Sequence, residues 1–223
     1  MTDRFVDRLE PRALFAAGGP QVTSELLVGN VDAVTAVVIG FDSQLEPLSA
    51  VNPDNFLFAG SRGGGRTVHD TPFVTPVYDD GARTVTLTFT KPLTLTRFKR
   101  LKIVVRGEET RGVRGADGTL LDGNRDGVPG EDSDSRYKIY RGTKFSYKDA
   151  DGDKVTLRAR GAKGRPMTTL FGPTRNVTQV WLAGTGNRIT GDLRQRKLSL
   201  GVTPIARVTL QDPTNTSDLA SPT

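Results

Sequence analysis

Short alternating segments separated by turn residues are the feature that most limits what this chain can fold into. In residues 84–90, apolar side chains alternate with threonine, so Val85, Leu87 and Phe89 share one face of an extended strand. Residues 101–106 repeat this alternation. Strands with one apolar and one polar face are typical of antiparallel sheets that pack one side on a core.

Turn signals divide the first part of the chain into pieces of strand length. A β-branched run at 34–41 and a short apolar run at 56–59 flank an Asn-Pro-Asp-Asn turn. Three glycines within 61–66 exclude a strand interior there, and an Asp-Gly pair precedes the strand at 84–90. About seven strands at such intervals predict an antiparallel β-sandwich over residues 20–142.

A second, smaller β-module is expected over residues 143–211. Segments 144–148 and 154–158 predict a hairpin around an acidic turn. Further strands are expected at 177–182, 188–190, 197–200 and 206–210. Strand periodicity alone leaves open whether this module is a small sandwich or part of a β-solenoid. The fold class is therefore all-β, with a flexible leader at 1–19 and a disordered polar tail at 212–223.

The charge is distributed unevenly along the chain. The net charge is +6, but residues 117–134 hold six acidic residues and one basic residue, whereas residues 154–207 hold eleven basic residues and one acidic residue. This asymmetry indicates either an anionic partner for the C-terminal third or a solvated surface balanced by the neighbouring module. Only Phe171 and Trp181 are aromatic in that segment, so nucleic acid is a weaker expectation than an anionic surface polymer.

The most distinctive candidate site is the loop at 120–134. Asp122, Asn124 and Asp126 alternate and are followed by Gly127, as in the first half of an EF-hand loop. Position twelve is a serine, so a bound calcium would need a last ligand from the pair Glu131 and Asp132. The alternative is an Asp/Asn/Gly loop selected for its turn conformation alone.

A second acidic cluster lies in the hairpin turn of the second module. Asp149, Asp151 and Asp153 are candidate calcium ligands there, although Lys148 and Lys154 flank them and would neutralise them without a metal. Calcium is the only cofactor that the sequence suggests.

Nothing in the sequence predicts catalysis. The single histidine, His69, has no nucleophile-elbow motif to accompany it, and there is no phosphate loop, dinucleotide fingerprint or zinc spacing. The chain has no cysteine and no apolar run approaching the roughly 20 residues of a membrane span. Residues 1–12 lack the basic start and apolar core of a signal peptide. We therefore expect a protein that is not an enzyme.

Two sets of motifs resemble known bacterial surface proteins. Residues 9–17 (LEPRALFAA) resemble the N-terminal Leu-Glu-Pro-Arg-x-Leu-Leu motif of large planctomycete exported proteins, with Phe15 in place of a leucine. The order of a Leu-Glu-Pro turn at 45–47, the strand at 84–90 and the loop at 118–123 resembles the bacterial S-layer-type Ig-like domain. The segment at 145–157 resembles a repeat found beside such domains in planctomycete surface proteins.

These resemblances imply a functional class and a location. They imply a secreted or cell-surface protein with a structural or adhesive role, possible contacts to neighbouring Ig-like modules or surface polymers, and loops stiffened by calcium. The competing hypothesis is a basic module that binds an anionic polymer, with the Ig-like part as a spacer.

Overall fold

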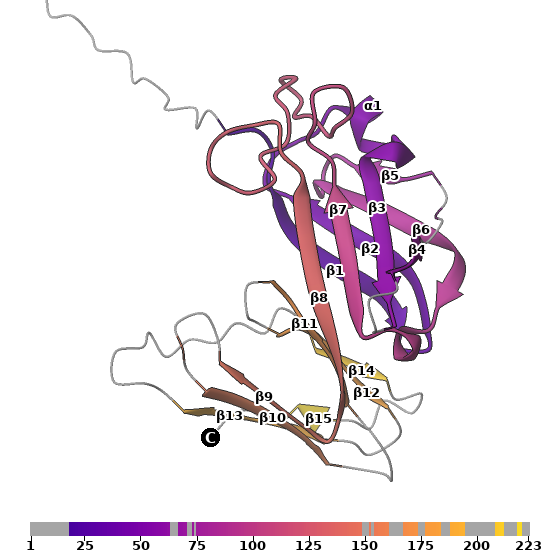
Figure 1. Cartoon of the computed structure of the whole chain (residues 1–223), viewed down its shortest axis with the longest axis vertical. Helices are drawn as coiled ribbons and strands as arrows, with labels where there is room; N and C mark the ends of the chain where they lie inside the picture. The colour runs from indigo at the N-terminus through magenta and orange to yellow at the C-terminus, as the bar shows by residue number, and fades with distance from the viewer. Residues whose placement is uncertain are drawn as a thin grey trace, which may run out of the picture.

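The computed structural model describes residues 18–62, 67–70, 73, 75–148, 152, 154–160, 167–173, 177–183, 188–194, 208–211 and 218–219. This part of the chain is almost entirely β, with three short helices of three or four residues. No helix within it has the length and apolarity needed to cross a bilayer. Figure 1 shows two β-modules that are joined by one long strand, β8.

The first module is the predicted antiparallel sandwich. One sheet has the order β1-β2-β6-β5, and its strands are β1 (Val22–Asn30), β2 (Ala33–Phe41), β6 (Thr84–Leu93) and β5 (Val77–Asp79). The opposing strands run in the order β8-β7-β3-β4, and they are β8 (Ser133–Gly142), β7 (Arg100–Val105), β3 (Phe56–Ser61) and β4 (Thr67–Asp70).

The core of the first module lies between these two sheets, as the alternation predicted. Val85, Leu87 and Phe89 are buried on β6, and Leu101 and Ile103 are buried on β7. Three short helices cap the loops, and they are α1 (Pro47–Ala50), η1 (Pro53–Asn55) and η2 (Leu95–Arg97). The predicted turn at 52–55 forms η1 and its cap.

The second module is also built from two sheets. The strands of the outer sheet, in spatial order, are β15 (Asp218–Leu219), β13 (Arg188–Arg194), β10 (Lys154–Arg160) and β9 (Lys144–Lys148). The facing strands are β11 (Met167–Phe171), β12 (Val177–Ala183) and β14 (Val208–Gln211). The predicted hairpin is confirmed, because β9 and β10 pair with Lys148 opposite Lys154. The strand at 167–171 was not predicted, and the strand expected at 197–200 lies outside the described residues.

The strands of the two modules share one sheet. Strand β8 pairs with β7 through residues 133–138 and with β11 through residues 138–142, so Lys138 has a cross-strand neighbour on each side. The result is a seven-stranded sheet with the order β14-β12-β11-β8-β7-β3-β4. The boundary that we predicted at residue 142 is the end of β8, but the sheet itself continues across it.

The shared sheet uses opposite faces in the two modules. Tyr137 and Ile139 on β8 belong to the core of the first module. The next side chain, Tyr140, lies on the other face, where its ring is 4.5 Å from that of Phe145 in the second module. Because side chains alternate along a strand, one strand can serve two cores that lie on opposite sides of the sheet.

A second connection joins β12 to the free edge of β1. The side chain of Gln179 is buried and forms two hydrogen bonds with the backbone of Leu27: it accepts from the N–H at 3.2 Å and donates to the carbonyl at 2.8 Å. The indole N–H of Trp181 donates to the carbonyl of Gly29 at 3.2 Å. These side chains occupy backbone groups that β1 would otherwise leave unpaired at a sheet edge. We call Gln179 and Trp181 the clasp.

Replacement of the clasp glutamine should lower the stability of the whole protein. Gln179→Ala leaves the N–H and carbonyl of Leu27 buried without these partners, and we expect the free energy of unfolding to fall by about 2–4 kcal/mol. Denaturant unfolding followed by tryptophan fluorescence measures this change. The control is Gln44→Ala, which removes an exposed bond to Asp80 and should change stability by less than about 0.5 kcal/mol. Equal effects of the two variants would contradict the role of the clasp.

Candidate functional site

The acidic loop closes one end of the first sandwich, at the entry to β8. Its path is fixed by backbone hydrogen bonds, because Asp122 N–H donates to the Pro20 carbonyl at 3.0 Å and Gly130 N–H donates to the Leu121 carbonyl at 2.8 Å. Gly123 lies so close to the other arm of the loop that a Cβ there would be 2.2 Å from the carbonyl carbon of Asp132. The glycine allows the two arms of the loop to touch.

Asp122 is fully buried and anchors this loop. Its Oδ2 accepts hydrogen bonds from the side chain of Gln21 at 2.7 Å and from the N–H of Gly127 at 3.1 Å. Gly127 has a φ of +89°, which glycine adopts without strain. The Oδ1 of Asp122 is buried with no hydrogen-bond partner in the described part of the protein. The carboxylate therefore holds the N-terminal segment against the loop and keeps one oxygen unused.

Asn124 and Asp126 face solvent and bond to each other. The Asn124 side chain accepts from the N–H of Asp126 at 2.9 Å and donates to its carboxylate at 3.0 Å. Asp126 in turn accepts from the N–H of Val128 at 2.8 Å. These are successive Asx turns, so the alternating oxygens stabilise the loop conformation by themselves.

The remaining predicted ligands do not converge on these residues. Glu131 is exposed and is bridged to Asp122 through the backbone, while Asp132 accepts the N–H of Gly107 at 3.0 Å. Among the described residues, no three acidic or histidine side chains form a group able to hold a metal ion. The predicted ligands of the second module lie outside the described residues: Asp149, Asp151 and Asp153. Calcium binding stays a prediction.

Two other sequence features are also beyond what the structure describes in atomic detail. The Leu-Glu-Pro-Arg segment at 9–12 lies outside the described residues, and His69 is described only as part of the backbone of β4.

Glu25 is a functional candidate that sequence reasoning missed. It lies on the edge strand β1 and its carboxylate accepts a short hydrogen bond from the hydroxyl of Tyr137 on β8. Its second oxygen, Oε1, is buried without a hydrogen-bond partner in the described residues. This pair joins the edge strand β1 of one sheet to β8 of the facing sheet. No sequence pattern signals it, since the residues are 112 positions apart.

Burial raises the pKa of Glu25 from 4.5 to about 7, against the opposing effects of hydrogen bonds from Tyr137 and Ser135 and of the charge on Arg125. Burial, together with the neighbouring carboxylate, also raises the pKa of Tyr137. Asp134 contributes a smaller repulsion to Glu25. The proton on Glu25 is therefore taken up on folding at any pH between the two values.

A basic surface is the other feature that the sequence analysis did not find. Arg100 on β7 lies directly opposite Lys138 on β8, and Lys102 lies directly opposite Arg136. All four point to the face of the shared sheet that lies away from the core of the first module, and we call them the basic face. The sequence pattern that could have revealed this surface is a pair of basic residues at alternate positions in each strand: 100 and 102 in β7, and 136 and 138 in β8.

Comparison with known proteins gives only distant similarities. No family model matches the sequence. No curated protein matches it. A solved structure of domains 1–6 of surface layer protein SbsC is 15% identical with a TM-score of 0.37, covering 78% of this chain and 26% of that one. The N-terminal part of the bacterial S-layer protein SbsC is 14% identical with a TM-score of 0.31, covering 78% of this chain and 44% of that one. The chain thus spans less than half the length of either structure, and likenesses this distant do not assign it to a family.

The buried carboxyl group should make stability depend on pH in an unusual direction. The pKa of Glu25 is about 7 in the folded protein, above its ordinary value of 4.5. The free energy of unfolding should therefore fall by at most about 3 kcal/mol as the pH rises from about 4.5 to 7, and it should then level off. Glu25→Gln mimics the protonated form and should remove this fall, as measured by urea unfolding between pH 5 and 8.

The matched control is the exposed Glu109→Gln, which should retain the pH dependence of the unaltered protein. Asp134, whose pKa is lowered chiefly by its hydrogen bond from Arg136, loses its stabilising effect only as the pH falls below about 4 and does not interfere. Parallel curves for the protein and for Glu25→Gln would refute the assignment.

Proposed function

We propose that this chain is a non-enzymatic structural module of an exported or cell-surface protein. The observation that carries the proposal is the continuity of β8, which gives backbone hydrogen bonds to both modules within ten residues. A pair of domains joined by a flexible linker is free to reorient, whereas a shared sheet is not. Fixed geometry between consecutive modules suits a protein that must keep a distance or an orientation.

The location is the second part of this proposal. It is supported by the resemblance of the chain to S-layer-type Ig-like domains and to the sorting motif at residues 9–17. Neighbouring Ig-like modules, or a polymer at the cell surface, are the partners that such a role requires.

Calcium at the loop of Asp122, Asn124 and Asp126 is the third part, and it would stiffen the entry to β8. Its support is the EF-hand-like order of the oxygen ligands and the unused buried oxygen of Asp122. Calcium bound to the folded state alone would raise the midpoint of thermal unfolding in millimolar calcium relative to a chelator, and an unchanged midpoint would remove this part.

Localisation tests the proposal in the source organism. An antibody raised against the folded chain should detect the protein in the surface or extracellular fraction, and protease added to intact cells should digest it. A cytosolic enzyme serves as the control for cell lysis. Detection only in the cytosolic fraction, protected from protease, would overturn the assignment to the cell surface.

A further inference from the structure

The basic face is unusual because it places like charges directly opposite each other. Arg100 and Lys138 are cross-strand neighbours on exposed positions, and the described residues offer neither of them a carboxylate within ion-pair distance. Lys102 and Arg136 share one acid, Asp134, at 3.3 and 2.8 Å. Like charges directly opposite on a sheet are destabilising, so the pair of Arg100 and Lys138, which has no such acid, lowers stability unless an anion is bound.

Solubility does not require these charges. The outer face of the other sheet in the same sandwich is partly exposed, and it is built largely from uncharged residues. Cross-strand pairing places Ser24, Val38, Thr86 and Thr88 on that face. The same fold therefore tolerates a nearly neutral outer surface, and the concentration of cations is specific to the shared sheet.

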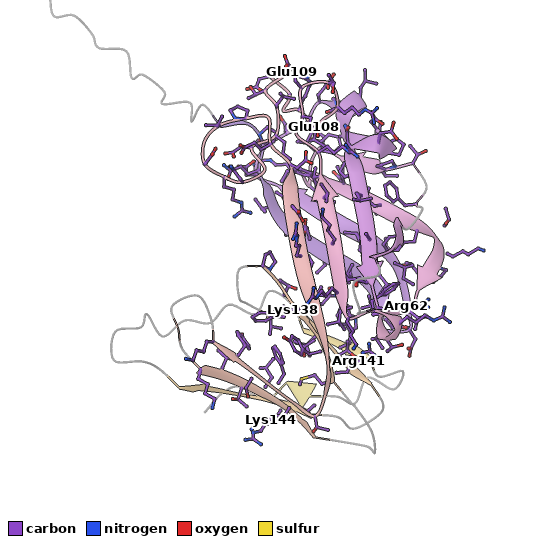
Figure 2. All side chains as sticks on the ribbon, viewed as in Figure 1. Arg62, Glu108, Glu109, Lys138, Arg141 and Lys144 are labelled. Atoms are coloured by element: carbon purple, nitrogen blue, oxygen red, sulfur yellow. The ribbon has the colours of Figure 1, made fainter. Side chains whose placement is uncertain are left out.

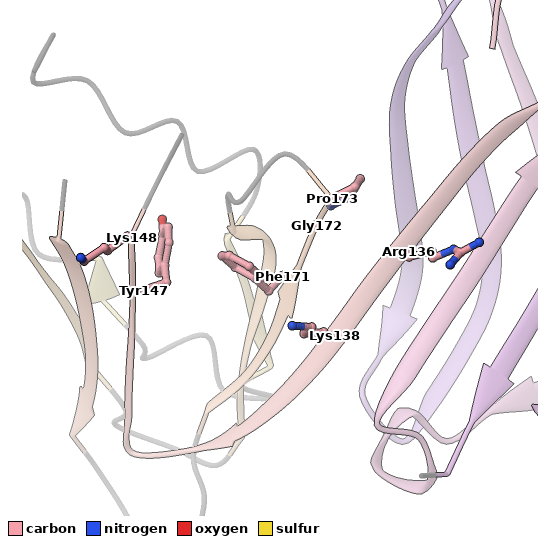
Figure 3. A pocket seen from close by; sticks show the side chains of 7 residues that line it. All are labelled: Arg136, Lys138, Tyr147, Lys148, Phe171, Gly172 and Pro173. Atoms are coloured by element: carbon pink, nitrogen blue, oxygen red, sulfur yellow. The ribbon is translucent and has the colours of Figure 1, made fainter. Parts of the chain in front are cut away.

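The basic face continues into a concave pocket where the second module rises from the sheet. The pocket has a volume of about 380 Å³ and is lined by Arg136 and Lys138 of β8, Tyr147 and Lys148 of β9, and the segment 171–173 (Figure 3). In Figure 2 the labelled Lys138 lies near this junction, while Glu108 and Glu109 lie at the opposite end of the first module. A groove that combines cations with an apolar floor can hold both the charge and the carbon skeleton of a ligand.

The aromatic rings at this pocket indicate which polyanion fits. Proteins that bind single-stranded nucleic acid offer exposed ring faces on which bases stack. Here the ring of Tyr147 is 5.5 Å from that of Phe145 and 5.1 Å from that of Phe171, and only 9% of Tyr147 is exposed. These rings pack on one another, so Tyr147 offers little open ring face on which a base could stack. This disfavours a nucleic acid as the polyanion, and the apolar contact left to a ligand is with Phe171 and Pro173 at the pocket wall.

We propose that the basic face, together with this pocket, binds an acidic polysaccharide, a sugar chain that carries carboxylate groups. The cations of β7 and β8 would pair with successive carboxylates, and Phe171 with Pro173 would contact a sugar ring. This binding site is independent of the structural role proposed above, since either can fail without the other.

The test is retention of the full chain on immobilised alginate, a polymer of uronic acids, eluted with a salt gradient. We expect retention at low salt and none on neutral dextran. Arg100→Gln/Lys138→Gln removes two cations of the basic face and should weaken alginate binding about three- to tenfold. Lys91→Gln/Arg111→Gln removes two exposed cations elsewhere, with the same change in net charge, and should bind as the unaltered protein does.

Thermal unfolding of both double variants verifies that they are folded. Arg100→Gln/Lys138→Gln should be at least as stable as the unaltered protein, because it removes the repulsion between these two cations. Absence of retention on alginate would overturn the proposal. An equal loss in both double variants would overturn it too, because binding would then follow net charge alone. Stronger binding to an oligothymidine single strand than to alginate at equal salt would replace it with nucleic-acid recognition.

Discussion

Strand β8 supplies backbone hydrogen bonds to two sandwiches, and most other features of the molecule depend on this arrangement. Its first half completes the sheet of the first module and its second half begins that of the second, with Lys138 paired on both sides. Each half of β8 is paired along one edge and the two pairings overlap at Lys138, so no unpaired linker residue separates the modules along this strand. The alternation of side chains then decides that the two cores lie on opposite faces of the shared sheet.

This arrangement leaves one strand edge unpaired by backbone and one face of the shared sheet uncovered. The edge of β1 in the first module faces β12 of the second, and Gln179 and Trp181 satisfy its outward backbone groups. The face of the sheet left uncovered in the first module becomes the side wall of a pocket at the junction. Two of the four cations on that face, Arg136 and Lys138, line this pocket.

The sequence was sufficient for the strands and cores, and insufficient for contacts between distant segments. Local alternation identified Val85, Leu87 and Phe89 as core residues. Strand β11 was missed because its residues, 167–171, are buried on both faces and show no alternation. The bond between Glu25 and Tyr137 depends on which strands face each other across the sandwich, and local sequence does not show this. The acidic loop could be located in the sequence, but its inward and outward carboxylates could not be distinguished.

The fixed relation between the modules can be measured directly, because the chain has no cysteine of its own. Spin labels at Thr88→Cys and Lys144→Cys report the distance between the two modules by pulsed electron resonance, and labels at Thr88→Cys and Lys102→Cys report a distance within the first module. A shared β8 predicts a single distance between the modules, with a distribution as narrow as the one within the first module. A broad or two-peaked distribution for the first pair alone would contradict the account.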